Sequence, residues 1–317
     1  MRVLTLFLIA GLVLAMTGPA WALTVPTIGN GALYAVSRNQ DNGTAYWLDS
    51  GTPEGVYVYD LSNPDPTLPT LHSQGPRGGQ TGEDGWGLAL MREIDAGIFH
   101  ADTNSVEQAF PVQNYYTLSA TSDTWLVGTF WGVTDTQVTI TVDGSGKQTL
   151  DVLSSNLNFV LYAVQKDQLD ANVGMDDLLP YVAGSRQPPS EYTGWLDPDA
   201  WAAGTYVKLL DGVSTSHEFV GSVNLANGKF TGHTDVYFDV DENGTGLWDP
   251  YWGVSGLFTD GNGNPADMYF SWGLENGQWD WDTTSRDFGG AQQVPEPATM
   301  VLVSLGGLGV LFGRKRK

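Results

Sequence analysis

The sequence predicts an all-β protein whose body is an antiparallel β-sandwich or jelly-roll-like fold with two short helices. Short apolar runs are separated by turn residues, and 40 of the 317 residues are glycine. The stretch 136–142 alternates strictly, with Val138, Ile140 and Val142 on one face, as in a sheet that has one face in water. Two Asn-Gly pairs lie between apolar runs, and Asn-Gly is the strongest short signal for a hairpin.

A series of strands is expected along the body, because each apolar run is bounded by turn residues. In chain order the expected strands cover 33–36, 56–59, 114–120, 125–133, 136–142, 149–153, 159–164, 219–225, 230–240, 269–274 and 279–281, and 88–91 is an apolar run. Hairpin turns are expected at Asn227-Gly228 and Asn276-Gly277. The stretch 71–85 is expected to form a long polar loop.

Two short helices are expected to interrupt the strands. The first covers 167–179 and stops before a proline. The second covers 197–204, with an Asp at the N-cap, a Pro at the first helical position and a Gly at the stop. Between them, 185–192 contains two adjacent prolines, so it is the candidate boundary if the body has two subdomains.

The N-terminal residues 1–22 have the pattern of a secretory signal peptide. Arg2 supplies the positive charge, 3–16 form an apolar core, and Ala20 and Ala22 form a small-x-small cleavage site. Cleavage is expected after Ala22, and a permanent N-terminal anchor is the alternative. The chain has no cysteine, which excludes a lipoprotein signal and any disulfide framework.

The C-terminal residues 294–317 have three parts. They read Val-Pro-Glu-Pro, then sixteen uncharged residues at 298–313, then four cations. As a helix the uncharged segment would rise about 24 Å, which is short of the roughly 30 Å hydrocarbon core, so it suits temporary holding in a membrane. Because cytoplasmic flanks carry the excess of Lys and Arg, the four cations are expected to stay on the cytoplasmic side. These membrane-stop residues are Arg314, Lys315, Arg316 and Lys317.

This tail resembles the PEP-CTERM sorting signal of Gram-negative bacteria. The resemblance is carried by Pro295, Glu296 and Pro297, followed by the apolar segment and the basic end, and it covers under a tenth of the chain. In that family an exosortase, a membrane cysteine transpeptidase, recognises and removes the tail. The resemblance implies exosortase as a processing partner, transient contact with the inner membrane, and delivery to the cell surface or the exopolysaccharide matrix. A plain tail anchor or a chance apolar terminus is the alternative.

The body between the two terminal segments is strongly acidic. Residues 23–293 contain 35 acidic and nine basic side chains, which leaves a net charge of −26. Such a surface repels nucleic acid and anionic membranes and attracts cations. Intrinsic disorder, the other acidic reading, is excluded because 11 of the 12 tryptophans lie in the body and imply packing.

Two acidic loops, 239–249 and 260–267, predict oxygen ligands for calcium. Both place Asp or Asn at positions 1, 3 and 5, and the first has Gly at position 6 as in an EF-hand, although its position 12 is Pro250. The candidate ligands are Asp239, Asp241, Asn243, Asp249, Asp260, Asn262, Asn264 and Asp267. The alternative is two ordinary acidic turns, because turns use the same residues. Calcium is the one cofactor that the sequence indicates.

Tryptophan is the second signal, since seven of the twelve fall between Trp195 and Trp281. Exposed rings on a sheet face could stack on sugars, while the alternative is packing in the core. Signals for catalysis are poor. There is no Cys nucleophile, Gly-x-Ser-x-Gly does not occur, and the four histidines lack metal-ligand spacing.

These observations favour a non-catalytic protein of the surface or the exopolysaccharide matrix. It would consist of a signal peptide at 1–22, an extracellular body at 23–293 whose function the resemblance leaves unassigned, and a sorting tail at 294–317. One alternative is a carbohydrate-binding module that uses exposed tryptophans in a row. The other is a secreted polysaccharide-active enzyme with two carboxylates in a cleft.

Overall fold

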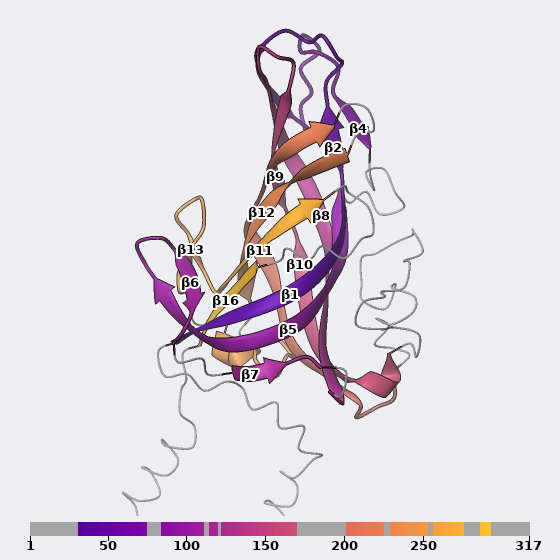
Figure 1. Ribbon diagram of the computed structural model, residues 1–317. Coiled ribbons are helices and arrows are strands. Elements are labelled where there is room, and N and C mark those ends of the chain that lie inside the picture. The colour runs from indigo at the N-terminus through magenta and orange to yellow at the C-terminus, as the bar shows by residue number, and fades with distance from the viewer. Residues whose placement is uncertain are drawn as a thin grey trace, which may run out of the picture.

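The computed structural model describes residues 31–74, 84–110, 114–119, 122–169, 201–224, 229–241, 243–252, 256–275 and 286–292. Within these residues the chain is mostly β-structure, and every strand pairing is antiparallel (Figure 1). The predicted antiparallel all-β class is therefore confirmed.

The strands are β1 (Gly31–Gly43), β2 (Ala45–Trp47), β3 (Gly55–Asp60), β4 (His72–Gln74), β5 (Gly85–His100), β6 (Ser105–Gln108), β7 (Asn114–Thr117), β8 (Thr124–Val142), β9 (Gln148–Ser155), β10 (Asn158–Gln165), β11 (Tyr206–Asn224), β12 (Lys229–Val240), β13 (Phe258–Thr259), β14 (Pro265–Ala266), β15 (Met268–Glu275) and β16 (Arg286–Gln292). The helical elements are the 3-10 turn η1 (Lys166–Gln168) and the one-turn helix α2 (Asp249–Trp252).

Twelve strands form one continuous sheet. Its order is β10-β8-β9-β11-β12-β15-β16-β1-β5-β6, with β3 beside β8 and β7 beside β5. Because β5 also pairs with β8, the hydrogen-bonded path from β8 through β11 and β1 returns to β8. The sheet therefore wraps around a central core. The ladders β2–β4 and β13–β14 stand apart from it.

The long strands bend and change partners along their length. The first half of β8 pairs with β5 and β10, and its second half pairs with β9 and β3. The change falls near Gly132, whose φ of 79° favours glycine, and near a register shift between Asp135 and Gln137. The prediction of two strands, 125–133 and 136–142, was wrong, because the chain bends at this point while the ladder bonds continue.

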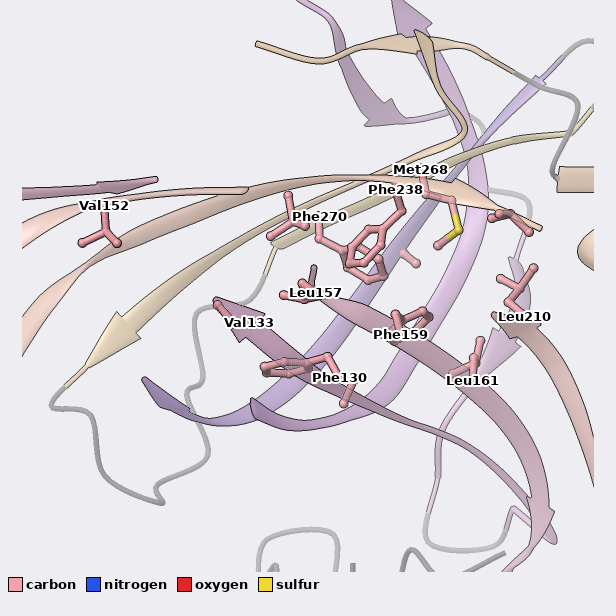
Figure 2. Packing of buried hydrophobic residues seen from close by; sticks show 14 of the residues in the cluster. Phe130, Val133, Val152, Leu157, Phe159, Leu161, Leu210, Phe238, Met268 and Phe270 are labelled. Carbon is pink, nitrogen blue, oxygen red and sulfur yellow. The ribbon is translucent and has the colours of Figure 1, made fainter. Parts of the chain in front are cut away.

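The main core lies inside the wrapped sheet (Figure 2). Three phenylalanines from different strands meet there. Phe159 lies 5.8 Å from Phe238 and 5.1 Å from Phe270 between ring centroids, and Phe238 and Phe270 lie 5.0 Å apart. Val138 and Ile140 are fully buried in the same cluster, so the alternation of β8 is confirmed. The outward face of the same stretch carries the threonines.

Outside the sheet two smaller clusters pack against it. In one, the Trp201 ring lies 5.6 Å from Tyr162 and 5.2 Å from Tyr206 in edge-to-face contacts. In the other, the turn of the β5–β6 hairpin docks on β13. There the Asn104 side chain donates to the Thr259 carbonyl at 2.6 Å and accepts from the Thr259 N–H at 2.9 Å. Asn104 has a φ of 51°, a conformation that Asn tolerates better than most residues.

The predicted strands recur, mostly as parts of longer ones. The strands of the hairpin around Asn227-Gly228 are confirmed, since β11 and β12 pair as far as Asn224 and Lys229. The prediction of one long polar loop over 71–85 was wrong in part, because β4 lies in it and pairs with β2.

The predicted helices are wrong where the structure describes them. Of 167–179 the structure describes 167–169, where the chain forms the 3-10 turn η1 and becomes extended at Leu169. Of 197–204, residues 201–204 form a bend and a turn. Tertiary contacts explain this, because Leu169 is buried and the Gln168 side chain accepts a hydrogen bond from the Ala202 N–H at 2.9 Å. The helix α2 was not predicted.

Five predictions lie outside the described residues. They are the signal peptide at 1–22, the boundary at 185–192, the turn at Asn227-Gly228, the turn at Asn276-Gly277 with its partner strand 279–281, and the tail at 294–317. In the part of the chain that the structure does describe, no helix has the length and apolar character needed to cross a membrane.

Candidate functional site

The first acidic loop, 239–249, wraps around its own carboxylate. Asp249 is fully buried, and its two carboxylate oxygens accept hydrogen bonds from the backbone N–H groups of Asp211 and Gly246. The loop can approach so closely because Gly244 and Gly246 have no side chain. A Cβ on either residue would collide with the Asp249 carboxylate. The last acid of the predicted calcium loop is therefore turned inward.

Burial governs the charge of this carboxyl. Burial, and then the side-chain hydrogen bond with Asp211, raise the pKa of Asp249 to about 6. Lys208 lies 2.7 Å from the Asp211 carboxylate and balances one of the two charges. The pair comes from β11 and from the start of α2, so it is created by folding and has no local signature in the sequence.

The other ligands predicted in this loop point elsewhere. The Asp241 carboxylate accepts the Asn243 N–H at 3.0 Å, which closes an Asx turn, and both residues are exposed. Asp239 is also exposed. Its pKa is raised by partial burial and then by the charges of Asp267 and Asp260. The structure thus brings the start of the first loop close to the second loop.

The second loop, 260–267, is organised by two buried carboxylates. Asp260 accepts hydrogen bonds from the N–H groups of Asn262 at 2.9 Å and Asn264 at 2.8 Å. Burial raises the pKa of Asp260, but the hydrogen bonds from Asn264, Asn262 and Thr215 outweigh it and hold that pKa below its usual value.

Asp267 accepts from the N–H groups of Val240 at 3.1 Å and Gly256 at 2.8 Å. Its hydrogen bonds tie this loop to the end of β12. Backbone donors therefore occupy both buried carboxylates of the second loop. The described residues contain no group of three or more His, Asp and Glu side chains placed to hold a metal ion. Calcium binding stays a prediction.

The described tryptophans mostly belong to the core. Trp125, Trp201, Trp248 and Trp252 are buried, and the last two stack with ring centroids 5.7 Å apart and planes 7° apart. Their packing confirms the core alternative for these four. Trp47 is half-buried and stacks on His72 at 5.7 Å. No row of exposed tryptophans occurs among the side chains that the structure describes.

One carboxyl pair escaped the sequence analysis. Glu93 and Asp95 lie on the same face of β5, and Asp95 is fully buried. Burial, and then a hydrogen bond with the Asp95 carboxyl, raise the pKa of Glu93. Gln108 of β6 donates to Asp95. The i, i+2 spacing on a strand was the available signal, but 35 acids in the body offer many such pairs.

A recess of about 400 Å³ lies between the end of β3 and the loop that leads to β4. It is lined by Tyr46, Tyr59, Asp60, Leu61, Pro64, Asp65, Pro66, Leu68, Pro69, Thr70, Leu71 and Ser73. No strand or helix was predicted between 60 and 70. The composition of 60–71 could have indicated a recess with polar and apolar walls, since prolines, apolar residues and two acids are mixed over these twelve positions.

Comparison with known proteins places the chain in a class through its tail. The molecule is an antiparallel β protein with a sorting signal after its last described strand. Residues 293–317 match the family model for the PEP-CTERM protein-sorting motif, so the resemblance seen in the sequence is confirmed. The motif supports an exosortase-processed, secreted surface protein of a Gram-negative bacterium. No curated protein and no solved structure matches the chain.

Proposed function

We propose that this protein is a non-catalytic component of the cell surface or the exopolysaccharide matrix. The sorting motif at 293–317 carries the proposal, because it implies export and processing by an exosortase. Two features of the body are consistent with a structural role. The buried carboxylates of Asp249, Asp260 and Asp267 accept hydrogen bonds from backbone N–H groups, and the described tryptophans pack mainly in the core.

In the proposed pathway the N-terminal segment acts in export and the C-terminal segment acts in sorting. The signal peptide at 1–22 directs export and is cleaved after Ala22. The apolar segment 298–313 then holds the chain in the inner membrane, with the cations from Arg314 onward on the cytoplasmic side. The exosortase acts at Pro295-Glu296-Pro297 and frees the body for transfer to the surface. The acidic body stays soluble at high local concentration because like charges repel.

The test follows the fate of the tail in the producing cells. Deletion of 294–317 is expected to send the protein into the medium, because nothing then holds it for the exosortase. The matched variant replaces Pro295, Glu296 and Pro297 with alanine and keeps the apolar segment and the cations. It is expected to accumulate uncleaved in the inner membrane. Mass spectrometry of the surface material reads the C-terminus directly, and an intact tail in the mature surface protein would overturn the proposal.

A further inference from the structure

The recess beside β3 contains two carboxylates whose orientation is fixed by their own turns. The Asp60 Oδ1 atom accepts from the Ser62 N–H at 2.9 Å, the Ser62 hydroxyl at 2.6 Å and the Asn63 N–H at 3.2 Å. The Asp65 Oδ1 atom accepts from the Thr67 N–H at 2.8 Å and the Thr67 hydroxyl at 2.7 Å. All of these bonds engage Oδ1, and among the described residues no donor reaches the Oδ2 atom of either side chain.

Both carboxyls are held in the charged form. The side-chain hydrogen bond from Ser62 is the main cause that lowers the pKa of Asp60, and the backbone hydrogen bond from Thr67 is the main cause that lowers the pKa of Asp65. Each Oδ2 is therefore a charged acceptor with a fixed direction. Hydrogen bonds to such acceptors are about twice as strong as those between neutral groups.

The loop around the recess is preformed. The Tyr59 hydroxyl donates to the Pro69 carbonyl at 3.0 Å and ties the far side of the loop to β3. Leu61 donates its N–H to the Thr136 carbonyl of β8 at 3.1 Å, which fixes the near side. Proline restricts the backbone at three lining positions. A loop that is already ordered loses little conformational entropy when a ligand binds.

The lining selects the chemistry of an occupant. The described lining residues include two carboxylates, several hydroxyls and the apolar side chains of Leu61, Leu68 and the prolines, and none of them is Lys, Arg or His. An anionic ligand would meet only repulsion from such a wall. A ligand that donates hydroxyl bonds on one side and presents C–H groups on the other would match both parts. A sugar unit has both features, and about 400 Å³ accommodates one or two of them.

We propose that this recess binds a neutral, hydroxyl-rich sugar unit of a polysaccharide, which donates hydrogen bonds to the carboxylates of Asp60 and Asp65 that line it. The proposal deepens the proposed function, since it rests on that function for the presence of a matrix polysaccharide. It needs no exposed tryptophan. The walls of the recess provide the apolar contacts instead.

The experiment uses variants that keep the turns and change only the free oxygens. Asp60→Asn and Asp65→Asn each retain a side-chain Oδ1 that accepts the same N–H bonds, but they replace the charged Oδ2 acceptor with an NH₂ donor. The matched control is Asp143→Asn. The Asp143 Oδ1 atom accepts from the Ser145 N–H at 2.8 Å and the Lys147 N–H at 3.0 Å in a similar Asx turn, outside the recess.

Affinity electrophoresis of the protein purified from the producing cells measures binding to dextran, mannan and galactan, with alginate as the anionic polymer. At least one neutral polymer is expected to retard the protein. Alginate is expected to leave its mobility unchanged. Asp60→Asn and Asp65→Asn are expected to weaken that binding about tenfold or more, while Asp143→Asn leaves it unchanged. Thermal melting of each variant confirms that the fold is intact.

Three outcomes would overturn the proposal. In the first, none of the three neutral polymers retards the protein. In the second, the wild type and the two recess variants are retarded equally. In the third, alginate retards the protein more than the neutral polymers do. Competition by spermidine at matched ionic strength would also overturn it, because the recess would then be a site for amines. Binding is measured on whichever form of the protein the cells accumulate, so a failure of sorting and a failure of sugar binding are read separately.

Discussion

Asp249 is fully buried, and its burial raises the pKa of its carboxyl. In the sequence it is the late acid of a candidate calcium loop, and in the fold it is a buried carboxyl that accepts two backbone N–H bonds. Its raised pKa means that the folded protein binds a proton more tightly at this position than the unfolded chain does. This difference makes the stability of the protein depend on pH.

The sign of that dependence follows from the two pKa values. The carboxyl titrates near 3.8 in an unfolded chain and near 6 in the fold, so between these values the folded state binds more protons. The free energy of unfolding therefore falls as pH rises from about 4 to 6, by up to about 3 kcal/mol, and this term is constant above that window. Asp249→Asn is expected to remove this fall in urea unfolding at pH 4.5 and pH 7.

The control for this measurement is Asp143→Asn. Its turn bonds, chiefly that from the Ser145 hydroxyl, lower the pKa of Asp143, so it titrates below the window and leaves the pH slope unchanged. An Asp249→Asn protein with the same pH slope as the wild type would show that Asp249 is ionised throughout. It would then contradict the burial argument.

Gly246 makes the buried carboxylate possible. A Cβ there would meet the Asp249 carboxylate and the Leu209 carbonyl at 2.5 Å, which is closer than any real contact. Gly246→Ala is expected to lower the free energy of unfolding by about 1–3 kcal/mol, because the loop must shift or the buried bonds must break. Gly261→Ala is the matched control, since no atom lies within 4 Å of its Cβ position and its cost should stay within about 0.5 kcal/mol. Equal effects in thermal melting would contradict this account.

At the scale of elements, the two acidic loops meet at the end of β12. Asp267 of the second loop accepts the Val240 N–H, and the charges of Asp267 and Asp260 act on Asp239 of the first. Close like charges are what a divalent ion would relieve, and this keeps the calcium prediction physically reasonable. The backbone donors on Asp249, Asp260 and Asp267 compete with an ion for the same oxygens.

Calcium is expected to raise the melting midpoint more than magnesium does at matched ionic strength, because magnesium requires a tighter octahedral site. Matching the ionic strength removes the screening that both ions supply. Asp241→Ala and Asp260→Asn are expected to reduce the calcium-specific shift, and the second variant keeps an acceptor for its turn. Equal shifts for both ions, unchanged in both variants, would show that the loops are acidic turns.

For the whole molecule, charge opposes compaction. The body has a net charge of −26 and the chain has no cysteine for a disulfide, so burial, hydrogen bonds and any bound ion must overcome the self-repulsion. Raising NaCl from about 20 to 500 mM shortens the screening length from roughly 20 Å to under 5 Å. The melting midpoint is therefore expected to rise. Choline chloride should give the same rise if screening is the cause, and a midpoint that falls in both salts would contradict the argument.

The wrapped sheet explains which parts of the fold were predictable. The alternation of 136–142 and the hairpin strands around 227–228 recur in β8 and in the β11–β12 pair, because side-chain periodicity is a local property. The continuity of β8 through Gly132 was not predictable. Its ladder bonds come from β5, β9 and β10, whose positions are set by the whole sheet. The described parts of the two predicted helices, 167–169 and 201–204, are not α-helical for the same reason, since the hydrogen bond between Gln168 and Ala202 joins distant parts of the chain.

The sequence by itself determined the fold class and the sorting signal of the protein. Both depend on local sequence patterns. The fold class follows from period-two alternation and turn residues, and the sorting signal is the linear motif at 293–317. Only the tertiary structure decided which of the acids are buried, paired or open. Asp249 meets Asp211 from 38 positions away, while Asp60 and Asp65 line a recess. The physical reason is that desolvation and hydrogen bonding of a carboxylate depend on neighbours that only long-range strand packing brings close.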